Sequence, residues 1–411
     1  MSGTPEPQII LPPAARWGPG FDVARATDAY IATIPAAERA KSDAYFEGGY
    51  WIDAWGTLIT VLIAWLLLGT RISARLRDFS ERRTRRPFLQ TFVYAACFLV
   101  AVSILSLPWE LYTGYFREHQ YGMSNLAIPG FMRDWSVSLA INLVIGSFAI
   151  AGLYAIVRRV GNRWVGWATV ITGVFMLFVL MISPVFIAPL FNDYHSLPAG
   201  ETRESILRLA RDAGVPADDV YWFDASRQTK RVSANVSGFA GTTRIALNDN
   251  LLNDTTPPEI RAVMAHEMGH YVLNHSLWLT LALALMLGFG YWVVNRLFGY
   301  FQHRHGEQWG VRGLSDPAGL PLAMAILAVV LLLLSPVKNS IIRTAEHQAD
   351  AFGLDTAHEP YGFASAAMRI SNYRKLEPSR LEEIIFFDHP SGRTRVERAM
   401  RWLADHPPGS S

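Results

Sequence analysis

The chain has 411 residues, of which 51% are hydrophobic and only 18% charged, with a formal net charge of +2. Soluble globular domains carry about 25% charged residues, so this composition argues against an ordinary soluble protein and indicates a multi-span membrane protein. The small net charge gives no electrostatic basis for a nucleic-acid partner. The single cysteine, Cys97, excludes a disulfide within the chain and argues against a thiolate metal site.

Six stretches are apolar and long enough, with their flanks, to cross a bilayer core, which takes about 20 residues of helix. They are residues 51–69, 92–107, 135–157, 164–190, 277–297 and 320–334. Tryptophans and tyrosines gather at several of their ends, as is typical of the membrane interface. We therefore predict a mainly α fold, a polytopic membrane helical bundle of about six spans, integral to a lipid bilayer.

The polar stretches divide the chain further. We expect an N-terminal extramembrane segment at 1–49, a four-span region at 50–190, a metalloprotease region at 191–276, a two-span region at 277–335 and a C-terminal helical region at 336–411. Within 191–276, "SILRLARDAGV" predicts a helix, and "VYWFD", "RVSANVSGF" and "TRIALND" predict strands. This indicates a small α+β, zincin-like unit.

A helix follows the last of these strands and carries the motif HEMGH. Thr256 and Glu259 form a capping box, with Pro257 at the first helical position. On such a helix His266 and His270 lie on one face and can bind one ion. Glu267, next to the first histidine, is placed as the general base that takes a proton from the attacking water.

A catalytic zinc needs a third protein ligand and an open fourth position. The stretch "IIRTAEHQADAFG" supplies Glu346, which completes a site of two histidines and one glutamate for one Zn²⁺ per chain. Asp350, four residues later on the same face, is placed to accept a hydrogen bond from the second nitrogen of a ligand histidine.

Two other interpretations compete with a protease. HEMGH is also compatible with polar residues near a membrane surface, and a membrane amphiphile-binding or transport protein with a structural zinc is the alternative from another class. A structural zinc is closed by four ligands and has no use for a carboxylate such as Glu267 beside it. His275, five residues after His270, is predicted to lie off the ligand face.

The chain resembles the CAAX prenyl protease type 1 family of integral-membrane zinc metalloproteases. The resemblance rests on an ordered set of segments after about residue 105: "LPWELYTGYFREHQYG", "APLFNDYHSLPAG", "VSGFAGTTRIALND", "HEMGHYVLNH", "EHQADAFG" and "DHPSGRTR". It implies a ring of membrane helices around an interior chamber, with His266, His270 and Glu346 as ligands, Glu267 as base and Asp350 as the supporting or proton-donating acid. His389 matches the family histidine that stabilises the transition state, and Arg395 matches a nearby arginine.

Three features depart from that family. Residues 1–49 stand where it has an additional span, serine stands at Ser233 where its edge-strand motif has asparagine, and nothing in the chain indicates that its substrates are prenylated.

The seven arginines of 71–86, on the same side as Arg158, Arg159 and Arg163, favour a cytoplasmic location for that side by the positive-inside rule. The family resemblance implies the reverse, so the sequence leaves the sidedness open. We predict a membrane zinc endopeptidase acting on peptides or proteins, with the oligomeric state unspecified.

Overall fold

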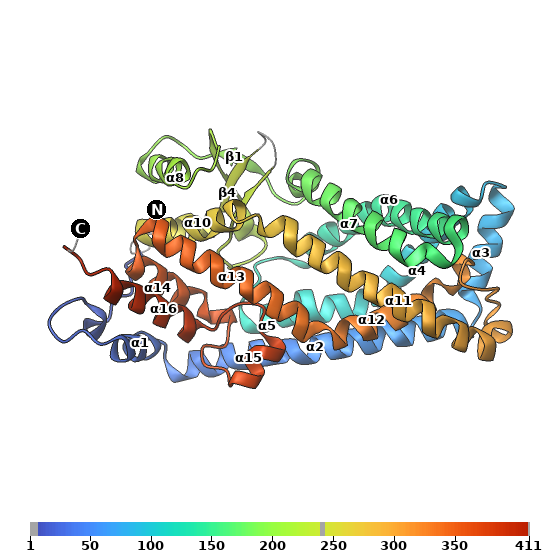
Figure 1. The fold of residues 1–411 in the computed structure, drawn as a ribbon, viewed down its shortest axis with the longest axis horizontal. Helices are drawn as coiled ribbons and strands as arrows, with labels where there is room; N and C mark the ends of the chain where they lie inside the picture. The colour runs from blue at the N-terminus through green and yellow to red at the C-terminus, as the bar shows by residue number, and fades with distance from the viewer. Residues whose placement is uncertain (1–6, 239–242, 410–411) are drawn as a thin grey trace.

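The computed structural model describes residues 7–238 and 243–409. Residues 1–6 of the expected N-terminal segment, 239–242 of the "VSGFAGTTR" segment and 410–411 of the C-terminal region lie outside the described residues. Figure 1 shows an elongated molecule in which long helices run along the long axis and a small sheet covers one end. The long helices are α2 (Ala36–Gly69), α4 (Pro87–Leu111), α6 (Ile128–Val160), α7 (Trp164–Ile182) and α11 (His275–Trp309).

The long helices expose their apolar side chains. In the most apolar window of the helical stretch Ile128–Leu190 only 6% of the residues are buried. Large side chains such as Trp55, Trp65 and Phe186 are more than half exposed. An apolar surface of this extent is costly in water and favourable in lipid, so the bundle surface is built to face a bilayer.

Six expected spans correspond to five long helices and one bent pair. By length and composition four helical stretches qualify as spans, or five with the bent pair, among the described residues. The stretch Ile128–Leu190 contains both α6 and α7, which lie in contact and are joined by a 3₁₀ turn at Gly161, where φ is +55°. Glycine suits that turn because it has no Cβ to clash at positive φ.

The sixth expected span is not a straight helix. α12 (Leu320–Leu333) has 14 residues, which is about 21 Å of helix and too short for a bilayer core. After a bend of 56°, the chain continues into α13 (Ser335–Ala357). Pro336 stands at the start of α13, where it can be accommodated without losing a helical hydrogen bond.

The sheet has four strands in the order β1-β2-β4-β3. Their bounds are β1 (Tyr194–Ser196), β2 (Val220–Phe223), β3 (Ala234–Ser237) and β4 (Arg244–Asn248). β2 and β4 are parallel, and β1 and β3 are antiparallel edge strands. Helices α8 (Glu201–Asp212), α9 (Asp249–Asp254) and α10 (Pro257–Val272) complete this unit around a core that includes Ile245, Leu247 and Met264. The helix and the strands expected from the sequence are therefore confirmed.

The C-terminal helices pack against both α10 and the start of the chain. They are α14 (Pro360–Arg369), α15 (Arg380–Phe386) and α16 (Gly392–Asp405). A shared core joins α1 (Val23–Ile31) to α14 and α16 through Tyr30, Phe363 and Met400. α2 begins at Ala36, so its first turns belong to this end of the molecule and its later turns to the membrane bundle.

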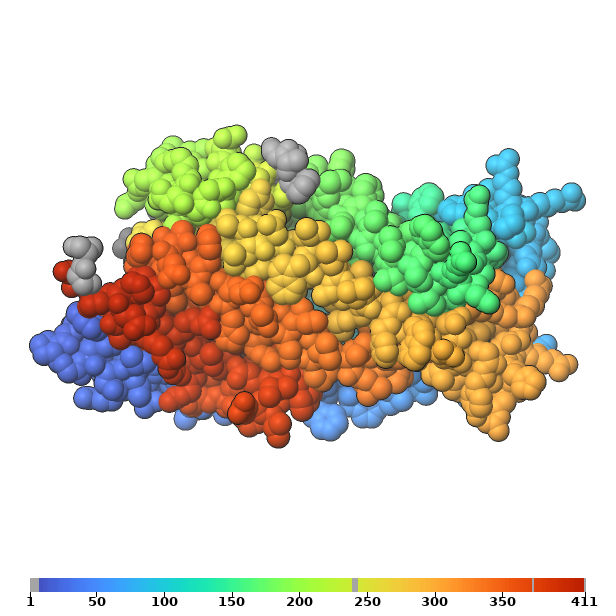
Figure 2. All heavy atoms as spheres, viewed as in Figure 1, coloured from blue at the N-terminus to red at the C-terminus, as the bar shows by residue number. Residues whose placement is uncertain are grey.

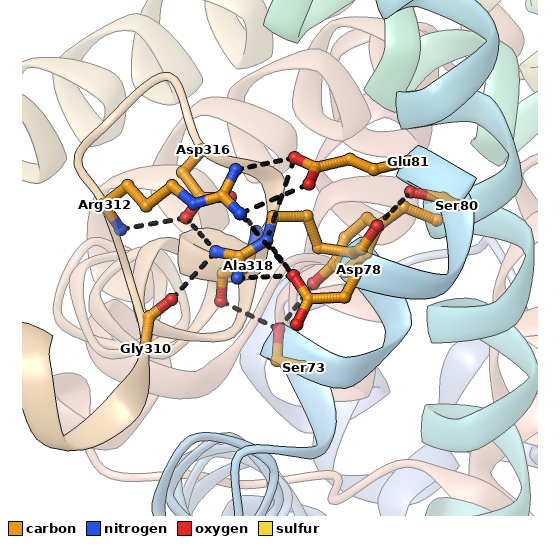
Figure 3. Close-up of polar contacts among 10 residues, drawn as sticks. Ser73, Asp78, Ser80, Glu81, Gly310, Arg312, Asp316 and Ala318 are labelled. Atoms are coloured by element: carbon orange, nitrogen blue, oxygen red, sulfur yellow. Dashed lines mark hydrogen bonds and ion pairs between the residues drawn. The ribbon is translucent and has the colours of Figure 1, made fainter. Parts of the chain in front are cut away.

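Two short helices connect the bundle at its ends, α3 (Ile72–Arg83) and α5 (Arg117–Tyr121). α3 lies at the end remote from the sheet (Figure 1). There a buried ion pair links it to the segment before α12, because Arg77 Nη1 lies 2.6 Å from Asp316 Oδ2. Arg77 also donates to the Gly310 carbonyl. Ser73 donates to the Ala318 carbonyl (Figure 3).

Candidate metal centre and active site

The helix that carries HEMGH is fixed at its start by the expected capping box. The backbone N–H of Thr256 donates to Glu259 Oε2 at 2.7 Å. The other carboxylate oxygen of Glu259 accepts from Ser365 and Arg369, which ties the first turn of α10 to α14. The helix therefore begins at a defined residue, and the register of its two histidines follows from that start.

Two helices bring together three side chains of the types that bind metal ions. His266 and His270 come from α10, and Glu346 comes from α13. Their ligand atoms lie within 4.8 Å of one another. The two imidazole Nε2 atoms are 3.2 Å apart, and the Nε2 atoms of His266 and His270 each lie 3.3 Å from a carboxylate oxygen of Glu346. Glu346 is buried, and within the described part of the chain its Oε2 accepts no hydrogen bond, so this oxygen lacks the donor that a buried carboxylate oxygen requires.

The second nitrogen of His266 is held by an acid. His266 Nδ1 lies 2.9 Å from Asp350 Oδ1, and Asp350 is fully buried. Arg395, from α16, donates to both carboxylate oxygens of Asp350 through Nε at 3.0 and 3.1 Å. The side chain of Asp350 is thus paired on two sides and holds the His266 ring with Nε2 directed at the cluster.

The second nitrogen of His270 is held by two uncharged side chains in succession, an imidazole and then an amide. His270 Nδ1 lies 2.8 Å from Nδ1 of His275, and His275 Nε2 lies 3.1 Å from the amide oxygen of Gln348. Because an amide oxygen only accepts, His275 carries its proton on Nε2 and accepts at Nδ1 from His270. That assignment leaves Nε2 of His270 with a free lone pair, as metal binding requires.

Glu267 and His389 line the same cleft as His266, His270 and Glu346. The cleft has a volume of about 310 Å³, and its apolar wall comes from α14 residues such as Phe363 and Ala366. Burial raises the pKa of Glu267 above its ordinary value. His389 Nε2 lies 3.4 Å from Glu346 Oε1, while its Nδ1 lies 2.8 Å from Asp388. Burial and the nearby Arg374 guanidinium lower the pKa of His389.

Glycines allow the two ligand helices to approach closely. A Cβ atom on Gly353 of α13 would lie 3.0 Å from the backbone nitrogen of His266. A Cβ on Gly269 of α10 would lie 3.2 Å from the Cα of Ala349. Both distances are shorter than ordinary contacts, so these positions require glycine for the present spacing of α10 and α13.

The structure thus gathers every site residue expected from the sequence around one cleft. It brings His266, His270 and Glu346 together, places Asp350 behind His266, and places Glu267 and His389 at the cleft; their roles stay predictions. Sequence reasoning missed the contact of His275 with His270. The available signal was Asn274, whose left-handed conformation (φ +54°) separates α10 from α11 and turns His275 back toward the ligands.

Comparison with known families covers almost the whole chain. Residues 196–403 match Peptidase family M48, and residues 24–193 match the family described as CAAX prenyl protease N-terminal, five membrane helices. Within 24–193 the described chain has four long apolar helices, α2, α4, α6 and α7.

Individual relatives show the same pattern. The chain is 28% identical to the uncharacterized metalloprotease YhfN of Bacillus subtilis over 88% of this chain and 85% of that protein. It is 27% identical to CAAX prenyl protease 1 of Saccharomyces cerevisiae, over 76% of this chain and 73% of that protein. The crystal structure of S. mikatae Ste24p superposes with a TM-score of 0.73 at 22% identity, over 90% and 89% of the two chains. The chain therefore belongs to peptidase family M48, with the membrane region of the CAAX prenyl proteases, and is a membrane-embedded metallopeptidase.

Proposed function

We propose that the protein is an endopeptidase with one zinc ion, held by His266, His270 and Glu346. Zinc binds nitrogen and oxygen ligands at about 2.0–2.1 Å, which places the ligand atoms of a tetrahedral site about 3.3–3.4 Å apart. Here the two Nε2 atoms are 3.2 Å apart, and each lies 3.3 Å from a different one of the two carboxylate oxygens of Glu346. Two imidazoles with one carboxylate also suit zinc better than calcium or magnesium, which prefer sets of oxygen ligands.

The site has three ligands and a neighbouring cleft, which favours catalysis over a structural role. Among the described residues, the group of mutually close ligand atoms comprises only these three side chains. A bound zinc supplies a Lewis acid that polarises the scissile carbonyl and makes a water molecule easier to deprotonate. The alternative of a binding or transport protein with a structural zinc is not favoured, because the peptidase family match spans the whole site.

Glu267 takes the proton from the attacking water and returns it to the leaving amine. It follows the first ligand on α10 and lines the cleft beside the three ligands. Asp350 keeps the His266 ring in the orientation that binding needs. His389 donates to the oxyanion. Because its Nδ1 donates to Asp388, the ring can donate from Nε2 only as an imidazolium. Burial and the Arg374 guanidinium lower the pKa of His389, while the carboxylates of Asp388 and Glu346 act in the opposite direction and supply part of the stabilisation that the imidazolium needs.

The free edge of β3 is the proposed binding place for the substrate backbone. Asn248 N–H donates to the Ser233 carbonyl at 2.9 Å, so hydrogen-bonded pairs alternate from residue 233 onward. The N–H and C=O groups of Ala234 and Val236 therefore point away from β4, along the edge of the sheet. Ser233 and Ala234 line the cleft together with the ligands. An extended peptide can add to this edge as a further strand.

The proposed substrates are proteins or peptides attached to the membrane, including those with a C-terminal prenyl-like anchor. The support is the apolar wall of the cleft, the bilayer-facing bundle beneath it, and the CAAX prenyl proteases among the relatives. The interior chamber implied by the family resemblance stays a prediction.

The test is the Glu267→Gln variant of the full-length protein in native membranes. This change removes the base and preserves the shape, so we expect normal metal content and a loss of cleavage of roughly 10²–10⁴-fold. Proteins trapped by the variant identify the substrates, and matched C-terminal peptides with and without a farnesyl group test the need for an anchor. Glu307→Gln, at the remote end of α11, is the control. Wild-type turnover by Glu267→Gln would reject the proposed mechanism.

A further inference from the structure

The end of the molecule opposite the metal site is strongly basic. Residues 70–87, 157–164 and 295–317 hold 13 arginines, no lysine and four carboxylates. Their formal charge is +9, which leaves −7 on the rest of a chain whose total is +2. Figure 2 shows residues 71–86, in light blue, projecting from this end of the molecule.

Three of the four carboxylates at this end are engaged by two of the arginines. Asp316 pairs with the buried Arg77, and Arg77 also contacts Asp78 at 2.7 Å. Arg312 binds Glu81 through both of its terminal nitrogens, at 2.7 and 3.2 Å. Figure 3 shows these groups gathered between α3 and the segment that precedes α12. The network fixes the end of the bundle and leaves the negative charge of these three groups unavailable to the other arginines.

The remaining positive charge is exposed and unneutralised. Arg71 donates to the backbone carbonyls of Glu307 and Gln308. In the part of the chain that the structure describes, ten more of the 13 arginines are exposed and form no ion pair with a carboxylate. They are Arg75, Arg82, Arg83, Arg85, Arg86, Arg158, Arg159, Arg163, Arg296 and Arg304. We call this set of ten the arginine collar.

The collar lies at the depth where the apolar helices end. Arg86 directly precedes α4, Arg158 and Arg159 stand in the last turn of α6, and Arg163 directly precedes α7. Trp164 donates its indole N–H to Asn295 at 2.8 Å, which places Arg296 of α11 at the same level. Ends of apolar helices are where lipid headgroups lie.

We propose that the arginine collar binds the anionic phospholipid headgroups of the leaflet in which this end of the bundle is embedded. A guanidinium matches two oxygens of a phosphate at once, and arginine is favoured over lysine for that contact. The collar spans three separate connections of the bundle, so headgroups bound there would bridge α3 and α4 to the α6–α7 turn and to α11. A free phosphate ion would meet only part of so extended a surface. The proposal does not depend on the metal chemistry.

The test uses the full-length protein and phosphatidylglycerol as the probe. Native mass spectrometry would measure phosphatidylglycerol binding to the protein in detergent, and thermal unfolding would be compared in phosphatidylcholine nanodiscs with and without phosphatidylglycerol. We expect tighter binding of phosphatidylglycerol than of phosphatidylcholine, a higher Tm in the anionic nanodiscs, and a smaller difference at high salt.

Variants locate the binding surface. Each arginine near an anionic membrane contributes roughly a fivefold gain in affinity. Replacing Arg82, Arg83, Arg85 and Arg86 by glutamine should therefore weaken phosphatidylglycerol binding at least ~10-fold, with an upper bound on the order of several hundred-fold. The matched control replaces four exposed arginines at the opposite end, Arg25, Arg208, Arg211 and Arg380, by glutamine and should bind normally.

Three results would overturn the proposal. They are equal binding of the two lipids by the wild-type protein, equal losses in the collar and control variants, and a Tm shift reproduced in full by soluble glycerol phosphate at the same concentration. The last result would indicate a site for a free phosphate. Should the fourfold variant fail to fold, the pairs Arg82→Gln/Arg83→Gln and Arg85→Gln/Arg86→Gln serve in its place.

Discussion

Replacing Gly353 by alanine should damage the metal site without removing any ligand. Gly353 belongs to α13, which carries Glu346, and it packs against the backbone of α10 at His266. The added Cβ would lie 3.0 Å from His266 N and 3.1 Å from His266 Cα, where ordinary contacts begin at 3.4 Å. Backbone atoms cannot rotate away as a side-chain end can, so the two helices must separate by about 0.3–0.4 Å.

The energetic balance sets the expected magnitude. Alanine gains about 1 kcal/mol over glycine in a helix interior, and overpacking costs about 1–3 kcal/mol. The net destabilisation is therefore about 0–2 kcal/mol, and the effect of interest falls on the geometry between Glu346 and the two histidines. Disturbing the support of a metal ligand costs about 10–100-fold in affinity, and we expect Gly353→Ala to fall in this range.

Competition with a chelator, in purified full-length protein, measures that affinity directly. Gly49→Ala is the control, because Gly49 lies in helix α2 at the same end of the molecule and no atom lies within 4 Å of the place that its added Cβ would take. It should bind metal normally and unfold at the same or a slightly higher temperature. Wild-type metal affinity and cleavage in Gly353→Ala would show that the close approach of α10 and α13 does not set the site.

Three further substitutions test individual side chains. Glu346→Ala should show much weaker metal retention in elemental analysis; full occupancy with full activity would exclude it as a ligand. His275→Ala should lower metal affinity about 10–100-fold by freeing the Nδ1 side of His270, whereas unchanged affinity would make the contact incidental. His389→Ala should lower kcat on the order of 10²–10³-fold with little change in KM and none in metal content. Loss of metal in that last variant would make His389 a ligand instead.

The local part of the site could be predicted from the sequence because it depends on short-range rules. The capping box at Thr256 and Glu259 fixes where α10 begins, and a spacing of four places His266 and His270 on one face. Strands β2, β3 and β4 follow from short segments that contain β-branched or aromatic residues. Glu346 could be proposed because the chemistry of a catalytic zinc demands a third ligand.

The tertiary part could not be predicted in the same way. The contact of His275 with His270 depends on Asn274 adopting a left-handed conformation, whereas a continuous helix would carry His275 off the ligand face. The bend between α12 and α13 breaks the expected sixth span, although the apolar run itself continues. The close packing at Gly353 depends on where two helices cross, which sequence spacing does not specify.

The ligand helices are direct continuations of the membrane helices, and this connection bears on which substrates reach the site. α10 passes into α11 through Asn274, and α13 follows α12 at a bend of 56°. His266 and His270 therefore lie just beyond one apolar helix, and Glu346 about three turns beyond another. A peptide held in the bilayer by an apolar anchor would reach the cleft without leaving the membrane surface, and the edge of β3 lines that cleft to receive its backbone. A soluble peptide is not concentrated at the membrane surface in this way. An apolar anchor on the substrate should therefore lower KM more than it raises kcat.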